Sequence, residues 1–547
     1  MTAPAELAFQ RSRSGRAAHR RERPSVWERV YCGWFPLIAA LVGVGLRSRE
    51  YIYNRSLWPD EIAVVRDIVG RSFGQLMHTT SNGQAAPIGW FWAERLSTNV
   101  FGISEFSLRL VPFVASLLAL GLFPYVAWKV AGRWVMPIAM LVFAMSPQII
   151  FYSSDVKQYG SDITCALLIV AVTIAVLERS PAFGPAAWWA VTAACVIWFS
   201  QPGILVAAGC GVVLFLRWVR QRRGLLWVGV AAFLPLVVLL EDYLSALRQQ
   251  SQSSLLQNYW VAGYPPKPFG VAKSARWLYH DVNALFADPG RLEHPALVLL
   301  LGAVGILVLV TQRSRRWTTP LVVLPIVLGV VFAFLRVYPL RQRLGLYLFP
   351  FIFILMCAGI PPLNKAVRPR VPLGGQRLVA VLVVAAVAAT SWSGLWRGVS
   401  IFGRPLDVTS GRQSAAFIVK HIEPGDVIYI QDPWATEAWD WYGVRDRLPS
   451  PGEFSFVASA AGCNAVPGVS QLPVGERVWV YFDSRGSDTP IDAEAIFLSY
   501  FMSVGHLLLH YELSGATGGA YLFQITGSGP APRPSWIPDG CLRLTGP

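Results

Sequence analysis

The chain has 547 residues, of which 54% are hydrophobic and only 14% are charged, and its mean hydropathy is +0.44. Soluble domains carry about 25% charged residues, so the composition excludes an ordinary soluble protein and predicts a polytopic α-helical membrane protein. The formal net charge of +15 would also suit a nucleic-acid binder. Most Lys and Arg residues, however, lie in short runs between apolar segments, where orientation in a bilayer explains them.

Residues 1–29 are Arg-rich and contain no apolar core or small-residue cleavage site, so they do not resemble a cleavable signal peptide. We expect them to form a cytoplasmic tail. The apolar runs that follow are long enough to cross a hydrocarbon core of roughly 30 Å, and they predict about eleven transmembrane helices. These lie near 30–50, 108–131, 134–152, 162–178, 185–200, 202–219, 225–245, 295–311, 317–335, 344–363 and 377–396.

Basic residues in the short loops predict the orientation. If the N-terminal tail is cytoplasmic, the basic residues of every second loop are cytoplasmic as well, as the positive-inside rule requires. They are Lys129, Arg133, Arg217, Arg220, Arg222, Arg223, Arg313, Arg315, Arg316, Lys365, Arg368 and Arg370. The exoplasmic side then receives the loop of about 51–107, the turn Ser153–Ser161, the loop of about 246–294 and the link Tyr338–Arg343. We expect a multi-pass plasma-membrane protein.

Residues 398–547 change character after the transmembrane domain of 30–397. The pattern predicts helices over Ser410–Ile422 and Asp492–Met502, and strands over Asp426–Gln431, Glu476–Phe482, Gly505–Leu513 and Ala520–Ile525. This is a small mixed α/β domain, which the loop count places on the exoplasmic side. Its two cysteines, Cys463 and Cys541, could form a disulfide in an oxidising compartment. The other five, Cys32, Cys165, Cys195, Cys210 and Cys357, are expected to be buried hydrophobes.

Ser56–Glu61, SLWPDE, places two adjacent carboxylates just after the first apolar segment. An amphipathic stretch, Ile62–Val69, follows and predicts a short helix on the membrane surface with Asp60 near its N-terminus. The carboxylates could simply complement the dipole of that helix behind Pro59. Charged groups at the outer end of the first segment, Arg47, Arg49 and Glu50, favour instead a polar cavity at this point.

Two further segments carry polar groups on the same side. In DVKQYG, the carboxylate of Asp155, the ammonium of Lys157 and the phenol of Tyr159 could hold a metal ion or a phosphate, or form an ordinary polar turn. In Tyr338–Arg343, two arginines lie outside against the charge bias; they could clamp a lipid-linked phosphate or only anchor the chain at headgroups. The sequence contains no zinc-like Cys/His spacing, P-loop or dinucleotide fingerprint.

The chain resembles the GT-C membrane glycosyltransferases of the protein O-mannosyltransferase and aminoarabinose-transferase type (family 39-type). The similar segments, in order, are SLWPDE, AAPIGWFWAERL, FGISEFSLRLVPF with Arg109, DVKQYG, YPLRQRLGLYLFP and IEPGDVIYI. The similarity is strongest over about 50–180. Two departures stand out: Lys157 replaces the arginine common in the family, and Gln84-Ala85-Ala86-Pro87 replaces the usual His-Pro-Pro.

The resemblance implies transfer of a sugar from a polyprenyl-phosphate donor to a hydroxyl of a glycan, lipid or protein acceptor, with inversion, on the exoplasmic face. It implies Asp60 as general base with Glu61 as its support, and Asp155 as a further catalytic or metal-binding carboxylate. The implied substrate-binding residues are Lys157, Tyr159, Arg109, Tyr338, Arg341 and Arg343. A divalent cation, Mg²⁺ or Mn²⁺, on Asp60 and Asp155 is the one cofactor implied.

Two other classes of function remain open at this point. The charged residues could form the path of a transporter or lipid flippase, although no inverted hydropathy repeat is evident and the charges gather at one membrane face rather than at the midplane. The chain could also be a silent binding or scaffold subunit. We expect no nucleic-acid partner.

Overall fold

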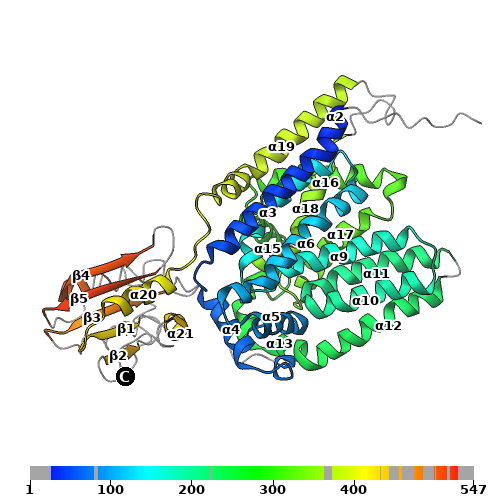
Figure 1. Cartoon of the computed structure of the whole chain (residues 1–547). Coiled ribbons are helices and arrows are strands. Elements are labelled where there is room, and N and C mark those ends of the chain that lie inside the picture. The colour runs from blue at the N-terminus through cyan, green and yellow to red at the C-terminus, as the bar shows by residue number, and fades with distance from the viewer. Residues whose placement is uncertain are drawn as a thin grey trace, which may run out of the picture.

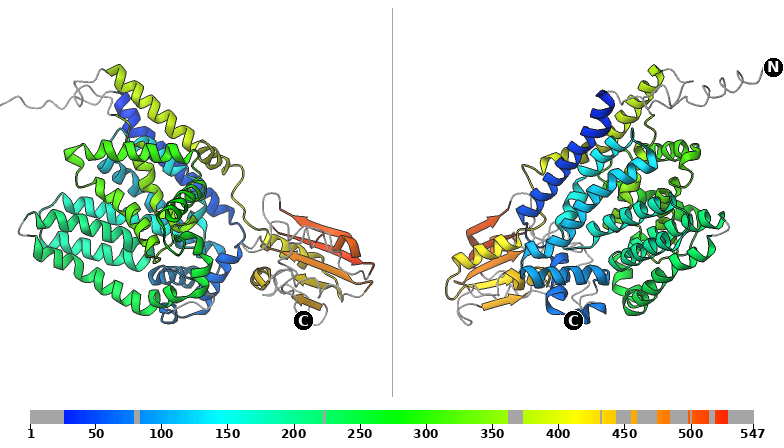
Figure 2. Two further views of the ribbon diagram at one scale, coloured as in Figure 1. Left: turned by 180° about the vertical axis from the view of Figure 1, so that it is seen from behind. Right: turned by 45° about the vertical axis from the view of Figure 1, so that its right-hand side comes forward.

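The computed structural model describes residues 26–78, 84–221, 224–361, 373–430, 433–442, 455–458, 474–483, 498, 501–513 and 518–527. Within these ranges the chain forms a large helical bundle with a small β-sheet unit beside it (Figures 1 and 2). The bundle contains α2 (Val26–Arg29), α3 (Phe35–Tyr53), α4 (Pro59–Gly70), α5 (Ile88–Phe101), α6 (Glu105–Ala131), α7 (Met136–Ala144), α8 (Pro147–Phe151), α9 (Tyr159–Leu177), α10 (Phe183–Phe199), α11 (Gln201–Val219), α12 (Leu225–Asp242), α13 (Arg248–Gln252), α14 (Ser254–Tyr259), α15 (Val271–Ala287), α16 (Pro295–Val310), α17 (Thr319–Phe334), α18 (Phe349–Cys357) and α19 (Leu373–Ser400).

Six helical runs in the described chain are long and apolar enough to span a membrane, which makes this an integral membrane protein. They are Val26–Tyr53, Glu105–Ala131, Tyr159–Leu177, Gln201–Val219, Leu225–Gln252 and Gly374–Ser400. Met136–Ala144 and Pro147–Ser154 form a seventh if taken together, with a bend of 56° between them. The bend falls where Pro147 starts the second piece, because proline cannot continue the helical hydrogen-bond ladder.

The other apolar helices are shorter: Phe183–Phe199, Pro295–Val310, Thr319–Phe334 and Gln342–Cys357. Each of the eleven predicted segments therefore overlaps a helix, but the count of eleven spans is not confirmed. The reason is length: a helix of 16 residues is only about 24 Å long, less than a typical hydrocarbon core.

Helix α9 lies at the centre of the bundle. It packs against α6, α10 and α11, and 83% of the residues in its most apolar stretch are buried. By contrast, only 17% of the residues in the most apolar stretch of Leu225–Gln252 are buried. The apolar side chains of this helix face outward, as suits lipid contact. The central helix therefore gives a fixed support to whatever residues stand at its two ends.

Basic side chains gather at the C-terminal end of α9. Lys129 contacts Glu178 at 2.6 Å, Arg133 pairs with Glu28, and Arg315 donates to the carbonyl of Val130. Three more, Arg217, Arg220 and Arg316, lie within 5.7 Å of the Trp317 ring centre. DVKQYG stands at the opposite end of α9, which is about 28 Å away for a helix of 19 residues.

The small sheet has the strand order β2-β1-β3-β5-β4. Its elements are α20 (Gly411–His421), β1 (Val427–Ile430), α21 (Pro433–Tyr442), β2 (Ser455–Ala458), β3 (Arg477–Phe482), β4 (Gly505–Glu512) and β5 (Gly519–Ile525). Strand β1 runs parallel to β2 and β3, and β5 pairs antiparallel with β3 and β4. We call α20, α21 and this sheet the C-terminal unit.

Both faces of the central strands are buried. Ile428 and Trp479 pack against α20 and α21 on one face, and Tyr429 and Val480 pack with Phe501 on the other. This burial explains why the sequences of these strands are almost continuously apolar. The four predicted strands and the first predicted helix are present, as β1, β3, β4, β5 and α20.

Strand β2 and helix α21 are additional elements that the sequence pattern did not predict. Most of the predicted helix Asp492–Met502, and both Cys463 and Cys541, lie outside the described residues, and the domain boundaries stay predictions. Of the five cysteines assigned to apolar segments, Cys165, Cys210 and Cys357 are buried as expected, Cys32 is half-buried, and Cys195 is exposed on α10.

The predicted helix after Pro59 is present as α4, but it packs inside the protein instead of laying its apolar face on the membrane surface. Ile62, Val65 and Ile68 are fully buried. They belong to a cluster that also contains Trp90 of α5 and Ala438 of α21. Residues of α5, α6 and α21 together bury the apolar face of α4.

Candidate active site

The chain leaves α3 through residues 54–58, which belong to no helix or strand; we call this segment the approach loop. It begins at Asn54, whose φ of 51° lies in the left-handed region that Asn tolerates better than most residues. It ends where Pro59 starts α4, a position that suits proline because the first turn has no partner for its missing N–H. Asp60 and Glu61 follow as neighbours in that turn and point in different directions, since successive helical residues are about 100° apart.

Asp60 faces two cations that come from distant parts of the sequence. The Nζ atom of Lys157 lies 3.1 Å from its Oδ1, and the Nη2 atom of Arg343 lies 2.9 Å from its Oδ2. Burial alone would raise the pKa of Asp60, but the charges of Arg343 and Lys157 outweigh it and hold the pKa below its usual range. Asp60 is therefore ionised at neutral pH.

Arg343 is held in place by aromatic residues. Its Nε donates to the hydroxyl of Tyr159 at 3.0 Å. Its guanidinium carbon lies 5.5, 5.6 and 5.4 Å from the ring centres of Trp58, Tyr159 and Trp260, within the range of cation–π attraction. Its orientation is thus fixed from several sides.

The two cations keep donors for a further ligand. Lys157 has three N–H donors and uses two, on Asp60 and on Oε1 of Gln84 at 2.8 Å. Arg343 uses Nε and Nη2, and no contact from the described residues engages its Nη1. The pair can therefore bind an anion with two or more oxygens while it still holds Asp60, which is what a phosphate requires.

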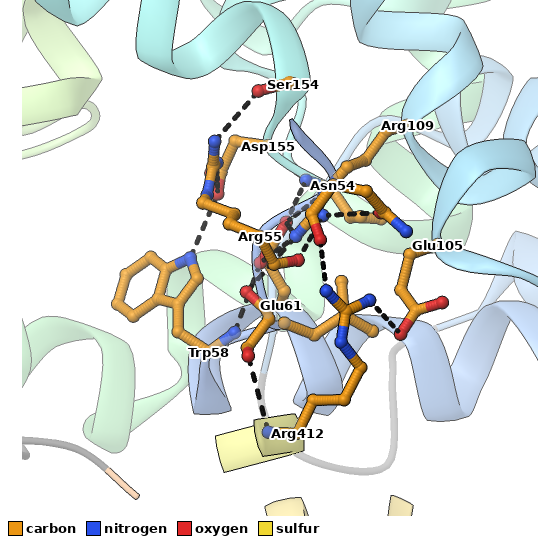
Figure 3. Close-up of polar contacts among 12 residues, drawn as sticks. Asn54, Arg55, Trp58, Glu61, Glu105, Arg109, Ser154, Asp155 and Arg412 are labelled. Carbon is orange, nitrogen blue, oxygen red and sulfur yellow. Dashed lines mark hydrogen bonds and ion pairs between the residues drawn. The ribbon is translucent and has the colours of Figure 1, made fainter. Parts of the chain in front are cut away.

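Glu61 has a different environment from Asp60. It accepts from Arg109 Nη2 at 3.0 Å, from the backbone N–H of Val156 at 2.8 Å and from that of Trp58 at 3.2 Å (Figure 3). Its side chain is fully buried. Glu61 therefore links the start of α4 to α6 and to the DVKQYG turn.

Arg109 requires a correction. The resemblance implies that it binds substrate, but its Nε, Nη1 and Nη2 all donate within the protein, to Glu61, to the Asn54 side chain and to the carbonyls of Arg55 and Ser56. Only 1% of the residue is exposed. Among the described residues each of the three guanidinium nitrogens of Arg109 already donates to a protein acceptor, so Arg109 holds the approach loop and Glu61 in place.

Asp155 also lies apart from Asp60. Its Oδ1 accepts from Arg55 at 3.1 Å and from Nε1 of Trp58 at 3.0 Å (Figure 3), and Arg55 also donates to Ser154 at 2.8 Å. Burial, with the nearby carboxylate of Glu61, raises the pKa of Asp155. Since Asp155 fixes the indole of Trp58, which lies over Arg343, it acts on the site through a neighbour.

The implied divalent cation does not fit these residues as they lie. Both oxygens of Asp60 face cations, and Asp155 faces Arg55, so each carboxylate already has its charge partner. Nowhere in the described ranges do three or more His, Cys, Asp or Glu side chains gather closely enough to hold a metal ion. The metal stays a prediction, and no step proposed below depends on it.

Of the two arginines in Tyr338–Arg343, only Arg343 reaches Asp60. Arg341 pairs with Asp281 of α15 at 3.1 Å, and the hydroxyl of Tyr338 donates to the carbonyl of Leu344 at 3.3 Å. Neither contacts Asp60 within the described structure. Gln342 has a φ of 44°, and this turn sends the two arginine side chains to different partners.

Two charged residues at the outer end of the first span, Arg47 and Glu50, are buried. Arg47 donates to the carbonyls of Gly43 and Ala144 and to the hydroxyl of Ser116, and it therefore ties α3 to α6 and α7. Glu50 accepts from the backbone of Leu406 at 2.8 Å. Arg49 is half-buried and donates to the carbonyl of Phe402 at 3.4 Å. The polar cavity expected at this point stays a prediction.

Four residues at the site escaped the sequence analysis: Arg55, Trp58, Gln84 and Trp260. Arg55 and Trp58 lie in or beside SLWPDE. The presence of an arginine directly before an acidic motif could have indicated that Arg55 belongs to the site. Gln84 stands where the family usually has the His-Pro-Pro segment, and its carbonyl group meets Lys157. Trp260 lies in the predicted loop of about 246–294, where no pattern in the sequence distinguishes it from a tryptophan at the membrane interface.

No family model and no curated protein matches the chain. Among solved structures, ArnT from Cupriavidus metallidurans bound to undecaprenyl phosphate is similar at 15% identity, over 92% of this chain and 99% of that chain, with a TM-score of 0.45. The Archaeoglobus fulgidus oligosaccharyltransferase is similar in its complex with Zn and sulfate (11% identity, 89% and 72% covered, TM-score 0.44) and tethered with an acceptor peptide (11%, 90% and 74%, 0.46). Similarity at this level leaves the reaction of this chain to be inferred from its own residues.

Proposed function

We propose that the protein is a GT-C glycosyltransferase that moves a sugar from a polyprenyl-phosphate donor to an acceptor hydroxyl, with inversion at the anomeric carbon. One observation carries the proposal: an ionised carboxylate, Asp60, lies between two cations that keep free donors, Lys157 and Arg343. A proton acceptor beside a phosphate-binding pair is what a direct displacement at a glycosyl phosphate needs.

The reaction follows from these positions. The acceptor oxygen attacks the anomeric carbon and forms the new glycosidic bond, while the bond from that carbon to the phosphate oxygen breaks. The proton of the acceptor hydroxyl passes to Asp60. The polyprenyl phosphate leaves with the bonding electrons, and Lys157 and Arg343 stabilise the charge that it gains. A single displacement inverts the configuration and requires no covalent sugar on the protein.

The proposal places the reaction at the exoplasmic face. The basic residues around Trp317 and Lys129 lie at the far end of α9 from Asp60, and the positive-inside rule makes such an end cytoplasmic. A plasma-membrane protein in this orientation would face cell-envelope glycans, lipids or proteins with its active site.

The direct test supplies the purified full chain with polyprenyl-phosphate hexoses and pentoses in turn, and with cell-envelope extract as acceptor. Mass spectrometry should detect a new glycosidic bond and free polyprenyl phosphate. The same protein in liposomes without acceptor should leave a fluorescent polyprenyl-phosphate sugar in its original leaflet. Movement of the lipid without bond cleavage would instead support the flippase alternative.

Arg343→Lys should slow transfer roughly 10- to 100-fold even though the charge is retained. A lysine cannot keep the bond to Tyr159 while it also reaches Asp60 and the phosphate, and one hydrogen bond to a charged group contributes about 1.5–3 kcal/mol. Steady-state kinetics with varied donor would measure the loss. Arg341→Lys, which changes the arginine paired with Asp281, is the matched control and should stay near wild type; equal losses in the two variants would contradict the assignment of Arg343.

Lys157→Gln should shift the acid limb of the pH–rate profile to higher pH. Lys157 helps to hold the pKa of Asp60 below its usual range, so its removal raises that pKa, and Asp60 then becomes protonated at a pH where the wild-type residue is still a base. The profile of kcat/KM measures this shift. Lys157→Arg keeps the charge and should keep the acid limb in place; an unchanged limb in Lys157→Gln would show that Asp60 does not control it.

A further inference from the structure

The approach loop determines where Asp60 lies, because the last residue of the loop, Trp58, is two positions before Asp60. Residues 54–58 belong to no helix or strand, so no regular hydrogen-bond ladder fixes their backbone. Their conformation depends on groups that other parts of the chain bring to them. From the bundle, Arg109 provides such groups through Asn54 and the carbonyls of Arg55 and Ser56.

The first turn of α20, in the C-terminal unit, holds the loop from the other side. Arg412 donates through Nη2 to the carbonyl of Asn54 (Figure 3), and its backbone N–H donates to the hydroxyl of Ser56 at 3.3 Å. That hydroxyl in turn donates to Oε1 of Gln413 at 2.6 Å. Ser56 thus satisfies one of the free N–H groups that a helix start leaves without an internal partner.

The last residue of α21 adds a contact one position further along the loop. The backbone N–H of Leu57 donates to the hydroxyl of Tyr442 at 2.6 Å. Burial, with Glu105 nearby, raises the pKa of Tyr442, so the hydroxyl stays neutral at physiological pH. It is therefore a suitable acceptor for a buried amide.

Two further contacts hold the C-terminal unit against the bundle, one just before the approach loop and one just after it. The hydroxyl of Tyr53 donates to Asp407 at 2.7 Å, just before α20. Ala438 of α21 belongs to the same buried cluster as Ile62 and Val65 of α4. The unit therefore touches the end of α3, the approach loop and α4, the three pieces of chain that lead to Asp60 and follow it.

We propose that the C-terminal unit is a positioning element for catalysis, in which Gln413 and Tyr442 hold the approach loop so that Asp60 meets Lys157 and Arg343. This inference rests on the proposed function. Within the described chain neither Gln413 nor Tyr442 contacts those three residues, so each acts through the loop. A shift of about 1 Å at a reacting group can cost roughly 100-fold in rate, which gives such a loop contact a measurable effect.

Tyr442→Phe removes the acceptor for the Leu57 amide and little else. We expect kcat to fall roughly 10- to 100-fold, while the KM for the donor lipid stays unchanged because Lys157 and Arg343 are untouched. Tyr521→Phe is the matched control: it also removes a tyrosine hydroxyl bonded to a partner, Glu512, but within the sheet. Its kcat should remain that of the wild type. Equal kcat values in the two variants would overturn the proposal.

Gln413 provides an independent test if Tyr442→Phe fails to fold. Gln413→Leu removes the oxygen that accepts from Ser56 and should lower kcat, whereas Gln413→Glu keeps an acceptor oxygen there and should restore most of it. A packing role alone predicts that both variants behave alike. That result would count against positioning.

Hydrogen–deuterium exchange separates this inference from the proposed function, because it requires no substrate. The peptide that contains Leu57 should exchange faster in Tyr442→Phe than in the wild type or in Tyr521→Phe. If the wild type transfers no sugar, the proposed function fails, while exchange still reports whether Tyr442 holds the loop. Unchanged exchange, or faster exchange with an unchanged kcat in an active protein, would overturn the inference.

Discussion

Replacing Asp60 with Asn should lower the rate of sugar transfer by about 10²- to 10⁴-fold, the usual contribution of a positioned general base. An amide of the same shape can still lie beside Lys157 and Arg343, but it cannot accept the proton of the acceptor hydroxyl. The variant should therefore still bind the donor lipid. Turnover of a labelled polyprenyl-phosphate sugar measures the loss, and a binding assay with the same lipid measures what remains.

Asp440→Asn is the matched control for this substitution. Asp440 also forms an ion pair with an arginine, Arg66, but its side chain is 51% exposed and belongs to α21. An exposed pair contributes little, so transfer should remain near wild type. Wild-type turnover in Asp60→Asn, with folded and membrane-inserted protein, would rule out Asp60 as the base.

Replacing Arg109 with Ala should destabilise the protein by about 3–5 kcal/mol, the cost of leaving one partner of a buried ion pair without the other. The carboxylate of Glu61 is fully buried, and Arg109 is its cationic partner at 3.0 Å. The approach loop would lose its bundle-side contacts in the same change. Thermal unfolding of the purified protein in detergent measures the effect.

Two further variants make the result specific. Arg66→Ala removes a partly exposed arginine that pairs with Asp440 and should cost about 0–1 kcal/mol. The double variant Arg109→Met with Glu61→Gln removes both buried charges and should recover part of the lost stability. If Arg109→Ala were no less stable than Arg66→Ala, Arg109 would not be the stabilising partner of the buried Glu61 carboxylate.

Much of the site could be anticipated because its residues sit at the ends of apolar segments. Asp60, Lys157 and Arg343 lie far apart in the sequence, yet counting spans placed all three segments on one side of the membrane. In the structure the side-chain nitrogens of Lys157 and Arg343 lie within 3.1 Å of the carboxylate oxygens of Asp60. Span ends are well marked by the change from apolar to polar residues, which is why this part of the arrangement was accessible from the sequence.

What the sequence could not indicate depends on local geometry and tertiary packing. The turn at Gln342 decides that Arg343, and not Arg341, reaches Asp60, and a positive φ at a glutamine has no sequence signal. The role of Arg109 depends on carbonyl groups of the approach loop, which every loop possesses. The burial of α4 depends on residues of α5, α6 and α21 that lie far away in the sequence.

The span count shows the same limit. The predicted segment 295–311 matches the helix Pro295–Val310 closely, but this helix, although apolar along its whole length, is short for a span. Packing determines how far such helices continue, and no window along the sequence includes it.

The central claim is that this protein adds a sugar to a component of the cell envelope, with Asp60 as the base. Its most direct test is mass spectrometry of cell-envelope glycans from a deletion strain that carries either the wild-type gene or the Asp60→Asn variant. One sugar should be missing in the deletion strain, return with the wild-type protein and stay missing with Asp60→Asn at equal expression. Full return of that sugar with Asp60→Asn, or no difference in glycans between the deletion and wild-type strains, would contradict this claim.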